Sequence, residues 1–464
     1  MIEDARKQIT DKPDLPPDIK ALLELLIGVI QILAWKRLAK NSHNSNVPPP
    51  MDPNREKKPK EKPGKKPGGQ PGHTGITLQQ CENPDVIIEI KVDRSGLPPG
   101  IWKPAGYEKR RIFDLKIVKQ VTEYRAEIPA NEKGGRVTAE FPEGLVRKAR
   151  YGSGVKAHGV YMSIQQLIPC GRVGGHFSSQ TGLPLSVGTV HNFKEEAYKP
   201  LEPYEAWVKA QIRGSKIIHC DETGIVADGK RVWLHVACNG HYTLYYPHGK
   251  RGKEATDEAG VLDGAGGVLI HDHRKPYFTY GHKEHGLCNA HYLRELAAAT
   301  EEGQRWPERM AGLLTETNRQ TDEAGGQLEE EDRRRVRKKY RGILTDAEKE
   351  NPIPPEAAGK KRGRAARAKT RNLPDRMRGY EGDILRFMAD ADVPFTNNRA
   401  ERDIRMVKVQ QKISGSFRSW DGAQFFCRIR GYLSTCEKHN VSSADALKIL
   451  FSGEFPDFMP DVAE

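Results

Sequence analysis

The fold assignment rests on the stretch KIIHCDETG, residues 216 to 224, and on GVLIH, residues 267 to 271, further along the chain. Each begins with a short apolar run that predicts a buried strand. An acid follows each run, Asp221 in the first case and Asp272 in the second. We therefore expect two carboxylates to lie at the ends of neighbouring strands.

The sequence between these stretches predicts two more strands, at 231–238 and 242–246, and a short helix at 254–260. Asn239-Gly240 joins the two strands and is a strong hairpin signal, because both residues tolerate the positive φ angles of a tight turn. Three antiparallel strands, a helix and a further strand are the opening of a ribonuclease-H-like α/β sheet. We expect such a core at 214–440.

Asp221 and Asp272 offer the hard oxygen ligands that Mg²⁺ or Mn²⁺ prefers. Two such ions, ~3.5–4 Å apart, stabilise both the attacking and the leaving oxygen of a phosphoryl displacement. Either aspartate alone would be better explained as an ordinary acid at a strand end or in a loop. The metal hypothesis depends on the two occurring together in this strand order and in a basic chain.

Glu401 completes an acidic triad in this hypothesis, although its local sequence has a second interpretation. Asn398-Arg399-Ala400-Glu401 matches a capping box, in which Asn398 caps a helix at 398–412 and Glu401 folds back onto the helix N-terminus. A carboxylate used in this way does not point at a metal, so the two roles exclude each other. Further along the same helix, three cations would line the path of a DNA backbone: Arg402, Arg405 and Lys408.

Histidine and cysteine residues are crowded between the second and third acids: His271, His273, His282, His285, Cys288 and His291. Cys288-x-x-His291 has the spacing of a zinc-ligand pair. No second pair stands at ligand spacing, so phosphate-contacting histidines or a packed Cys/His pair remain the alternatives.

The chain before residue 214 divides into four segments. Residues 1–45 predict a helix whose apolar spacing fits either a self-associating coiled coil or a helix packed on its own chain. Residues 46–80 form a basic Pro/Gly linker. Residues 81–150, with β-rich runs at 86–91 and 117–121, predict a small β module. Residues 151–205 predict helices around Gly182 and an N-cap at Ser186, which fits a helix-turn-helix or another all-α unit.

Polar helices are expected from 291 to about 390, with a basic stretch at 360–378. Three candidate DNA-binding residues of that stretch are Lys361, Arg362 and Arg364. A last helix is expected at 421–438 and a C-terminal tail at 441–464.

The composition favours a nucleic-acid partner. The chain of 464 residues carries a formal net charge of +13, and its most apolar stretch is shorter than the ~20 residues of a spanning helix. We therefore expect no membrane association. No secretory signal is visible, and seven scattered cysteines suit a reducing compartment, so a cytoplasmic location is expected, associated with the nucleoid through DNA.

At these residues, over roughly 20 to 445, the sequence resembles the transposases of the insertion sequence 66 family. Asp221-Glu222-Thr223 with Trp233 resembles the first acidic motif, and Asp272 with Tyr277 resembles the second. The segment CNAHYLREL, from Cys288 through His291, resembles the one that follows, and NNRAER, with Glu401, resembles the third acidic motif. The N-terminal helix and GGQPGH, residues 68 to 73, resemble the family's N-terminal region.

The resemblance implies a DDE transposase that cuts the terminal repeats of a bacterial mobile element and joins them to target DNA. It implies Asp221, Asp272 and Glu401 as catalytic metal ligands, which decides against the capping box, and a helical insertion at about 300–390. Trp233, Tyr277, Cys288 and His291 would support the site, and Arg402 would contact it or the DNA. Double-stranded DNA, a homo-oligomer and small accessory proteins are the implied partners.

One departure from the family pattern concerns zinc. The family usually carries paired cysteines before the core, whereas 81–150 contains Cys81 as its single cysteine and no histidine. Since a structural zinc site needs four ligands, we expect no zinc in this segment. Two rival functions follow from the sequence: a catalytically inactive, transposase-derived DNA-binding protein, and a zinc-dependent hydrolase built on the His/Cys cluster.

Overall fold

The computed structural model describes Leu23, Leu26, Leu78, Leu145 and residues 81–142, 149–281, 283–352 and 369–460. Apart from the leucines at 23, 26 and 78, the predicted N-terminal helix and basic linker lie outside the described residues. Lys361, Arg362 and Arg364 lie outside them as well. The described residues belong to two units that divide between Thr122 and Glu123.

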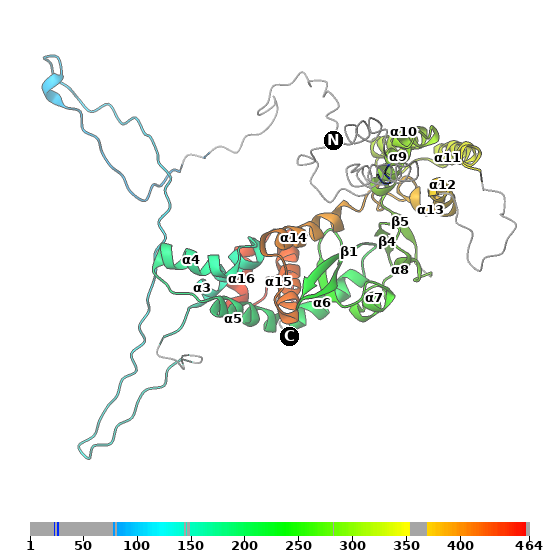
Figure 1. Cartoon of the computed structure of the whole chain (residues 1–464). Coiled ribbons are helices and arrows are strands. Elements are labelled where there is room, and N and C mark those ends of the chain that lie inside the picture. The colour runs from blue at the N-terminus through cyan, green and yellow to red at the C-terminus, as the bar shows by residue number, and fades with distance from the viewer. Residues whose placement is uncertain are drawn as a thin grey trace, which may run out of the picture. The chain divides into compact units, whose positions relative to one another are not determined.

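A five-stranded mixed sheet lies in the second unit (Figure 1). Its strands are β1 (Ile217–Ala227), β2 (Lys230–Cys238), β3 (Thr243–His248), β4 (Val268–His271) and β5 (His285–Leu287). The order across the sheet is β3-β2-β1-β4-β5. The first three strands are antiparallel, whereas β4 pairs parallel with β1 and β5 parallel with β4. The predicted succession of three antiparallel strands, a helix and a further strand is confirmed.

Strand β1 is longer than expected. The prediction ended it at Cys220, but β1 continues to Ala227 and pairs with β2 from His219↔Cys238 to Ala227↔Lys230. The physical reason is the tight turn at Asp228-Gly229, where both residues adopt positive φ angles of 51° and 69° and close a continuous hairpin. Asp221 therefore lies within a strand and not at the end of one.

Between residue 149 and the sheet, the structure has the α-helices α3 (Ser153–Val160), α4 (Cys170–Thr181), α5 (Val187–Tyr198) and α6 (Glu202–Arg213). Two local predictions are confirmed: Gly182 ends α4 in the left-handed region at φ 68°, and the Ser186 hydroxyl caps α5 by accepting the N–H of Thr189. Helix α3 ends at Val160 and continues directly into a π-helical segment (Tyr161–Gln165).

The helices after β3 are α7 (Lys253–Ala259), α8 (Lys275–Phe278), α9 (Asn289–Glu301), α10 (Trp306–Glu323), α11 (Glu330–Glu350), α12 (Lys369–Gly379), α13 (Glu381–Ile384), α14 (Asn398–Ser414), α15 (Trp420–Lys438) and α16 (Ser443–Ser452). Figure 1 shows α9 to α13 gathered beyond the β5 edge of the sheet. Among the described residues, no helix combines the length and apolar character needed to cross a membrane.

The segment expected as a C-terminal tail is part of the core. Helix α16 begins at Ser443 with Ser442 as its cap, and Ala446 and Leu447 are fully buried. The apolar spacing of this segment gives the helix a face that packs against α15 and α3, which removes it from water.

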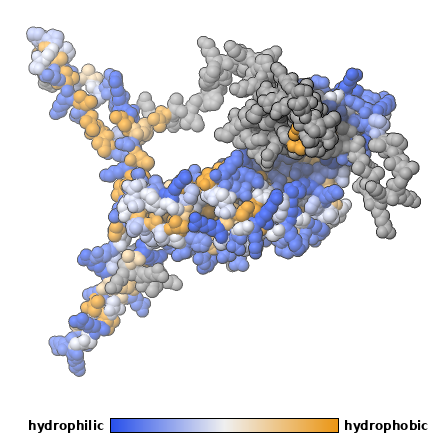
Figure 2. All heavy atoms as spheres, in the orientation of Figure 1, coloured by the Kyte–Doolittle hydropathy of each residue, from blue (hydrophilic) through white to orange (hydrophobic). Residues whose placement is uncertain are grey.

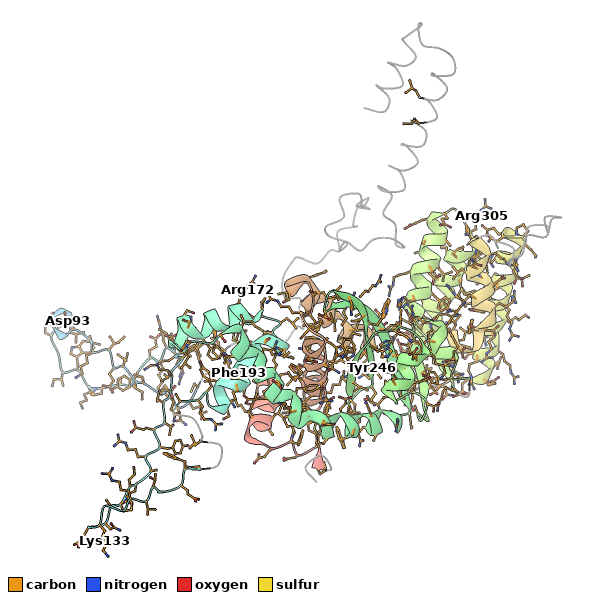
Figure 3. The ribbon with its side chains drawn as sticks, turned by 60° about the horizontal axis from the view of Figure 1, so that its bottom comes forward. Asp93, Lys133, Arg172, Phe193, Tyr246 and Arg305 are labelled. Carbon is orange, nitrogen blue, oxygen red and sulfur yellow. The ribbon has the colours of Figure 1, made fainter. Side chains whose placement is uncertain are left out.

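Two buried clusters meet at β4. Leu269 belongs to the cluster that includes helices α3 to α6, α15 and α16, whereas Val268 and Ile270 belong to the cluster of α9 to α13. Because successive side chains of a strand point to opposite faces, one short strand contributes to both clusters. In Figure 3 the side chains of Phe193 and Tyr246 lie among densely packed neighbours of the first cluster and the sheet.

The strands expected at 86–91 and 117–121 are absent from the described part of the chain. Between 81 and 142 the structure contains a 3₁₀ turn at Arg94–Gly96 and one isolated bridge, Ala130↔Arg136. Apolar side chains there remain exposed, for example Ile88 at 82% and Ile112 at 95% (Figure 2). Strand pairing gains stability when one face is buried, and the apolar side chains of these two segments remain exposed.

Candidate active site

The register of the sheet brings Asp221 and Asp272 together. In the parallel pair of β1 and β4, His219 lies opposite Ile270. Each aspartate stands two residues further along its own chain in the same direction, so the two carboxylates share an edge and a face of the sheet. The predicted pairing of these acids is thus supported by the strand alignment, although Asp221 reaches its place from within β1.

The two aspartates repel each other in a partly dehydrated setting. Burial, followed by the charges of Asp272 and Glu222, raises the pKa of Asp221 to about 8. Burial and the charge of Glu222 raise the pKa of Asp272 to about 7. Asp221 accepts a hydrogen bond from the Glu222 main-chain N–H at 2.8 Å, whereas Oδ1 of Asp272 is buried without a hydrogen-bond partner. Both carboxylates would be stabilised by a nearby cation.

Glu401 enters the site from the first turn of α14. The capping-box interpretation is wrong, because Asn397 and not Asn398 occupies the N-cap position, and no side chain caps the helix. Asn397 is instead fully buried and binds β1, donating to the Cys220 carbonyl at 2.8 Å and contacting Nδ1 of His219 at 2.9 Å. The Asn397 side chain therefore binds β1. Glu401 forms no capping hydrogen bond at the start of α14, so its carboxylate is available to the site.

Burial is the largest cause of the raised pKa of both Asp221 and Asp272, and the charge of Glu401 adds a smaller increase to each. Helix α14 is held in this place from its other side. Asp403 pairs with Lys438 of α15 at 3.0 Å and accepts a hydrogen bond from Thr243 of β3 at 3.2 Å. The three predicted catalytic residues therefore come from β1, the end of β4 and α14.

Cys288 and His291 lie beside Glu401. The sulfur of Cys288 and Nδ1 of His291 are 3.7 and 3.6 Å from the same Glu401 oxygen, Oε1. A guanidinium nitrogen of Arg294, one helical turn further along α9, is also 3.6 Å from this oxygen. The predicted supporting residues of this segment are thus at the site and contact its third carboxylate.

A buried ion cluster next to the aspartates was missed by the sequence analysis. The Glu222 side chain, 2% exposed, receives Nε of Arg251 at 3.0 Å, Nε of Arg274 at 2.6 Å and the hydroxyl of Tyr277 at 2.8 Å. Arg274 stands two residues after Asp272, so its ion pair fixes the loop that carries the aspartate. The adjacency of Glu222 to Asp221 was the available signal, but its partners are distant in sequence.

Trp233 and Tyr277 support this cluster and not the aspartates directly. The guanidinium of Arg251 lies 4.1 Å from the centre of the Trp233 ring, and that of Arg231 lies 5.1 Å from it. Such cation–π contacts orient Arg251 toward Glu222. The cluster keeps a carboxylate and two guanidinium groups in defined positions beside the acidic pair.

The predicted DNA-contacting residues of α14 are exposed. Arg402, Arg405 and Lys408 lie on its open face, and Nζ of Lys408 donates to the Gly224 carbonyl of β1 at 3.2 Å. Arg402 also lines a polar pocket of about 340 Å³ together with Arg399, His219 and Asn239. The helix that carries Glu401 therefore presents positive charge alongside the site.

The donor set at this site fits hard divalent cations. Burial is the main reason that Asp221 and Asp272 have a raised pKa, Glu401 adds to the effect through its charge, and Oδ1 of Asp272 is buried without a partner. Among the described residues, the ligand atoms that all lie within 4.8 Å of one another belong to Cys288, His291 and Glu401 and not to the three acids. Mg²⁺ and Mn²⁺ bind through a few carboxylates and keep several waters, which suits a partly open site of this kind.

Comparison with known proteins agrees with this geometry. The model of the family described as "Transposase IS66 family" matches residues 148–425, which is more than half of the chain and includes all three acids. No curated protein matches the chain.

Proposed function

Because the chain belongs to the transposase IS66 family, which supports a transposase role and DNA binding, we propose that it cuts and joins DNA ends by metal-dependent phosphoryl transfer at Asp221, Asp272 and Glu401. The proposed catalytic domain is ribonuclease-H-like. The sheet order β3-β2-β1-β4-β5, with three antiparallel strands followed by two parallel ones, supports that assignment.

The observation that carries the proposal is the alignment of Asp221 and Asp272, each two residues beyond the paired positions His219 and Ile270 of β1 and β4. Burial and neighbouring charges, with Glu401 as the smallest contribution, raise the pKa of both aspartates, which supports the inclusion of Glu401. Acids that raise one another's pKa destabilise the metal-free fold when they are ionised. Such strongly shifted carboxylates cluster at functional sites.

The metal-binding residues would be Asp221, Asp272 and Glu401, with two Mg²⁺ or Mn²⁺ ions. Bound metal would supply activation of the attacking oxygen, from water for strand cleavage or from a 3′-hydroxyl for joining, and stabilisation of the leaving oxygen. The chain's own residues do the remaining work. The Glu222–Arg274 pair holds the loop of Asp272 in place, and Arg402, Arg405 and Lys408 position the phosphate backbone beside the acids.

The proposed substrates are the terminal repeats of a bacterial insertion sequence and the target DNA. Helices α4 and α5, with the turn at Gly182, are proposed as a helix-turn-helix that contributes DNA binding. We further propose that the protein acts as a homo-oligomer, together with accessory proteins of the same element, and that residues 81–150 bind no zinc.

The test is Asp272→Asn, a nearly isosteric change that removes one negative ligand. Nicking of end-containing DNA with Mg²⁺ should fall by at least about 10²-fold, since the charge removed acts on the reacting phosphate. DNA binding, measured by gel shift, should stay near that of the unchanged protein. Full nicking by the variant would overturn the assignment of the triad. A wild-type protein that binds DNA but never nicks it would favour the inactive, DNA-binding alternative.

A further inference from the structure

The residues Cys288, His291 and Glu401 form a compact group, and the proposed chemistry of oxygen-bound metals uses only Glu401 from it. Their ligand atoms all lie within 4.8 Å of one another. Cys288 is buried and stands at the N-cap of α9, His291 is in the first turn of the same helix, and Glu401 comes from α14.

Two of the three ligand-to-ligand distances are close to those of a tetrahedral zinc site, and the third is within 4.8 Å. Zinc bonds of ~2.3 Å to sulfur, ~2.0–2.1 Å to nitrogen and ~2.0–2.2 Å to oxygen imply ligand-to-ligand edges of roughly 3.4–3.6 Å. The observed edges from Glu401 Oε1 are 3.7 Å to the Cys288 sulfur and 3.6 Å to Nδ1 of His291. The two edges to Glu401 therefore need to change by only a few tenths of an ångström to fit one ion.

Two features of the surroundings favour a bound cation. Nδ1 of His291 is buried without a hydrogen-bond partner, so its lone pair has no other use in the described structure. Burial raises the pKa of the Cys288 thiol, and the Asn397 main-chain N–H, which donates to its sulfur at 3.1 Å, acts against this increase and fixes the direction of the sulfur. The opposing feature is Arg294, but its side chain is 55% exposed and free to swing away from Glu401.

We propose that Cys288, His291 and Glu401 bind a thiophilic divalent ion, best matched by Zn²⁺, and that its binding withdraws Glu401 from the catalytic centre and inhibits the nuclease. The inhibitory part rests on the proposed function of Glu401. Thiolate and imidazole select zinc over the oxygen-preferring Mg²⁺, so the two metals do not compete for the same ligand set. Zinc and Mg²⁺ share a single ligand, the Glu401 carboxylate. Its Oε1 cannot point at the Cys288/His291 pair and at the two aspartates at the same time.

Binding is tested first, without reference to activity. Full-length protein is dialysed against Zn²⁺ alone, and the thiolate-to-metal absorption of the Co²⁺-loaded protein is recorded. We expect one ion per chain bound through this site, a cobalt spectrum with a thiolate band, and at least ~10-fold weaker binding in Cys288→Ser and His291→Gln. Cys170→Ser and His176→Gln, at a partly buried cysteine and a histidine outside the group, are the matched controls and should bind as the unchanged protein does.

Inhibition is tested next, as the ratio of Mg²⁺-dependent nicking with and without Zn²⁺ for each protein. Wild type and Cys170→Ser should lose nicking at Zn²⁺ concentrations near the measured Kd, whereas Cys288→Ser should keep a ratio near one. The proposal is overturned if no stoichiometric zinc is bound, if the cobalt complex of wild type lacks a thiolate band, or if zinc inhibits Cys288→Ser as strongly as wild type. Failure of the proposed function has a different signature: wild type then shows no nicking with Mg²⁺, while the dialysis result still decides whether the zinc site exists.

Discussion

At the scale of single residues, the main feature of the site is repulsion between neighbouring carboxylates, which the rest of the fold holds close together. Asp221 and Asp272 are adjacent because two strands are in parallel register, and each raises the cost of ionising the group beside it. Glu222, by contrast, is neutralised by Arg251 and Arg274. Glu222 thus has its ion-pair partners within the protein, whereas Asp221 has none among the described residues and is available to a bound cation.

The charge repulsion predicts a pH-dependent effect of Asp272→Asn on stability in chelator. The pKa of Asp272 is raised to about 7 in the folded protein and is about 3.9 in the unfolded chain, so folding binds the proton more tightly. Stability contributed by the protonated acid is therefore lost as pH rises through this window. The variant cannot ionise, and at pH 8 it should be more stable than wild type by roughly 1–3 kcal/mol, allowing for partial solvent screening.

Thermal unfolding with EDTA measures this difference. The gain should widen from pH 5.5 to pH 8, and it should shrink when Mg²⁺ is added, because bound metal stabilises the wild-type carboxylates. Equal melting temperatures for the two proteins at pH 8 in EDTA would contradict the electrostatic account of the site.

At the scale of elements, the packing of α4 against the segment before α5 depends on one glycine. A Cβ atom added at Gly174 would lie 2.3 Å from the Leu185 carbonyl oxygen, whereas one added at the neighbouring Gly175 would meet nothing within 4 Å. Both glycines lie in the same helix, so their helix propensities are matched.

Gly174→Ala should therefore destabilise the protein by about 1–3 kcal/mol or more, because the helix must move away from Leu185. Gly175→Ala should be neutral or stabilising by up to about 1 kcal/mol, since alanine restricts the unfolded chain and favours the helix. Urea denaturation of the two variants measures the contrast. A similar loss in both would show that α4 does not pack closely on Leu185.

Helix α14 combines the third acid with an exposed row of cations, and this predicts how its variants bind DNA. Arg402→Gln removes one proposed phosphate contact and should lower the slope of log affinity against log salt by about 0.9. The loss should be nearly the same for different DNA sequences, because a phosphate contact carries no base information. Arg319→Gln on α10, whose guanidinium is occupied by Glu316 and Glu323, is the control. A slope that stays unchanged in Arg402→Gln would remove α14 from the DNA interface.

At the scale of the whole molecule, the net charge of +13 predicts strongly salt-dependent DNA binding. Several phosphate contacts, each worth about 0.9 in the slope, should reduce affinity by orders of magnitude between 50 and 200 mM salt. Deleting residues 1–75, which include the basic tract, should reduce both the slope and any self-association. Titrations of both proteins at several salt concentrations measure the slopes, and light scattering measures association. Affinity that is insensitive to salt would refute electrostatic docking.

The sequence by itself determined the local elements around the site. Apolar runs and the Ser186 cap are short-range signals, and the elements around the site form close to where these signals predict them. Two details differ: β1 continues past Asp221 to Ala227, and Asn239 and Gly240 connect β2 to β3 without positive φ angles. The family motifs supplied the role of Glu401, which local rules alone assigned equally well to a helix cap. Local signals were sufficient here because capping, turns and periodicity act between residues close in sequence.

Only the tertiary structure decided what depends on partners far along the chain. The full length of β1 follows from pairing with β2, the freedom of Glu401 follows from the binding of Asn397 to β1, and the burial of Glu222 follows from two arginines and Tyr277. The strands expected in 81–142 failed for the same reason, since their apolar residues find no surface to cover. Burial and charge pairing depend on contacts between residues that are distant in sequence. A sequence pattern shows which residues need a partner, but the fold determines which partner each residue contacts.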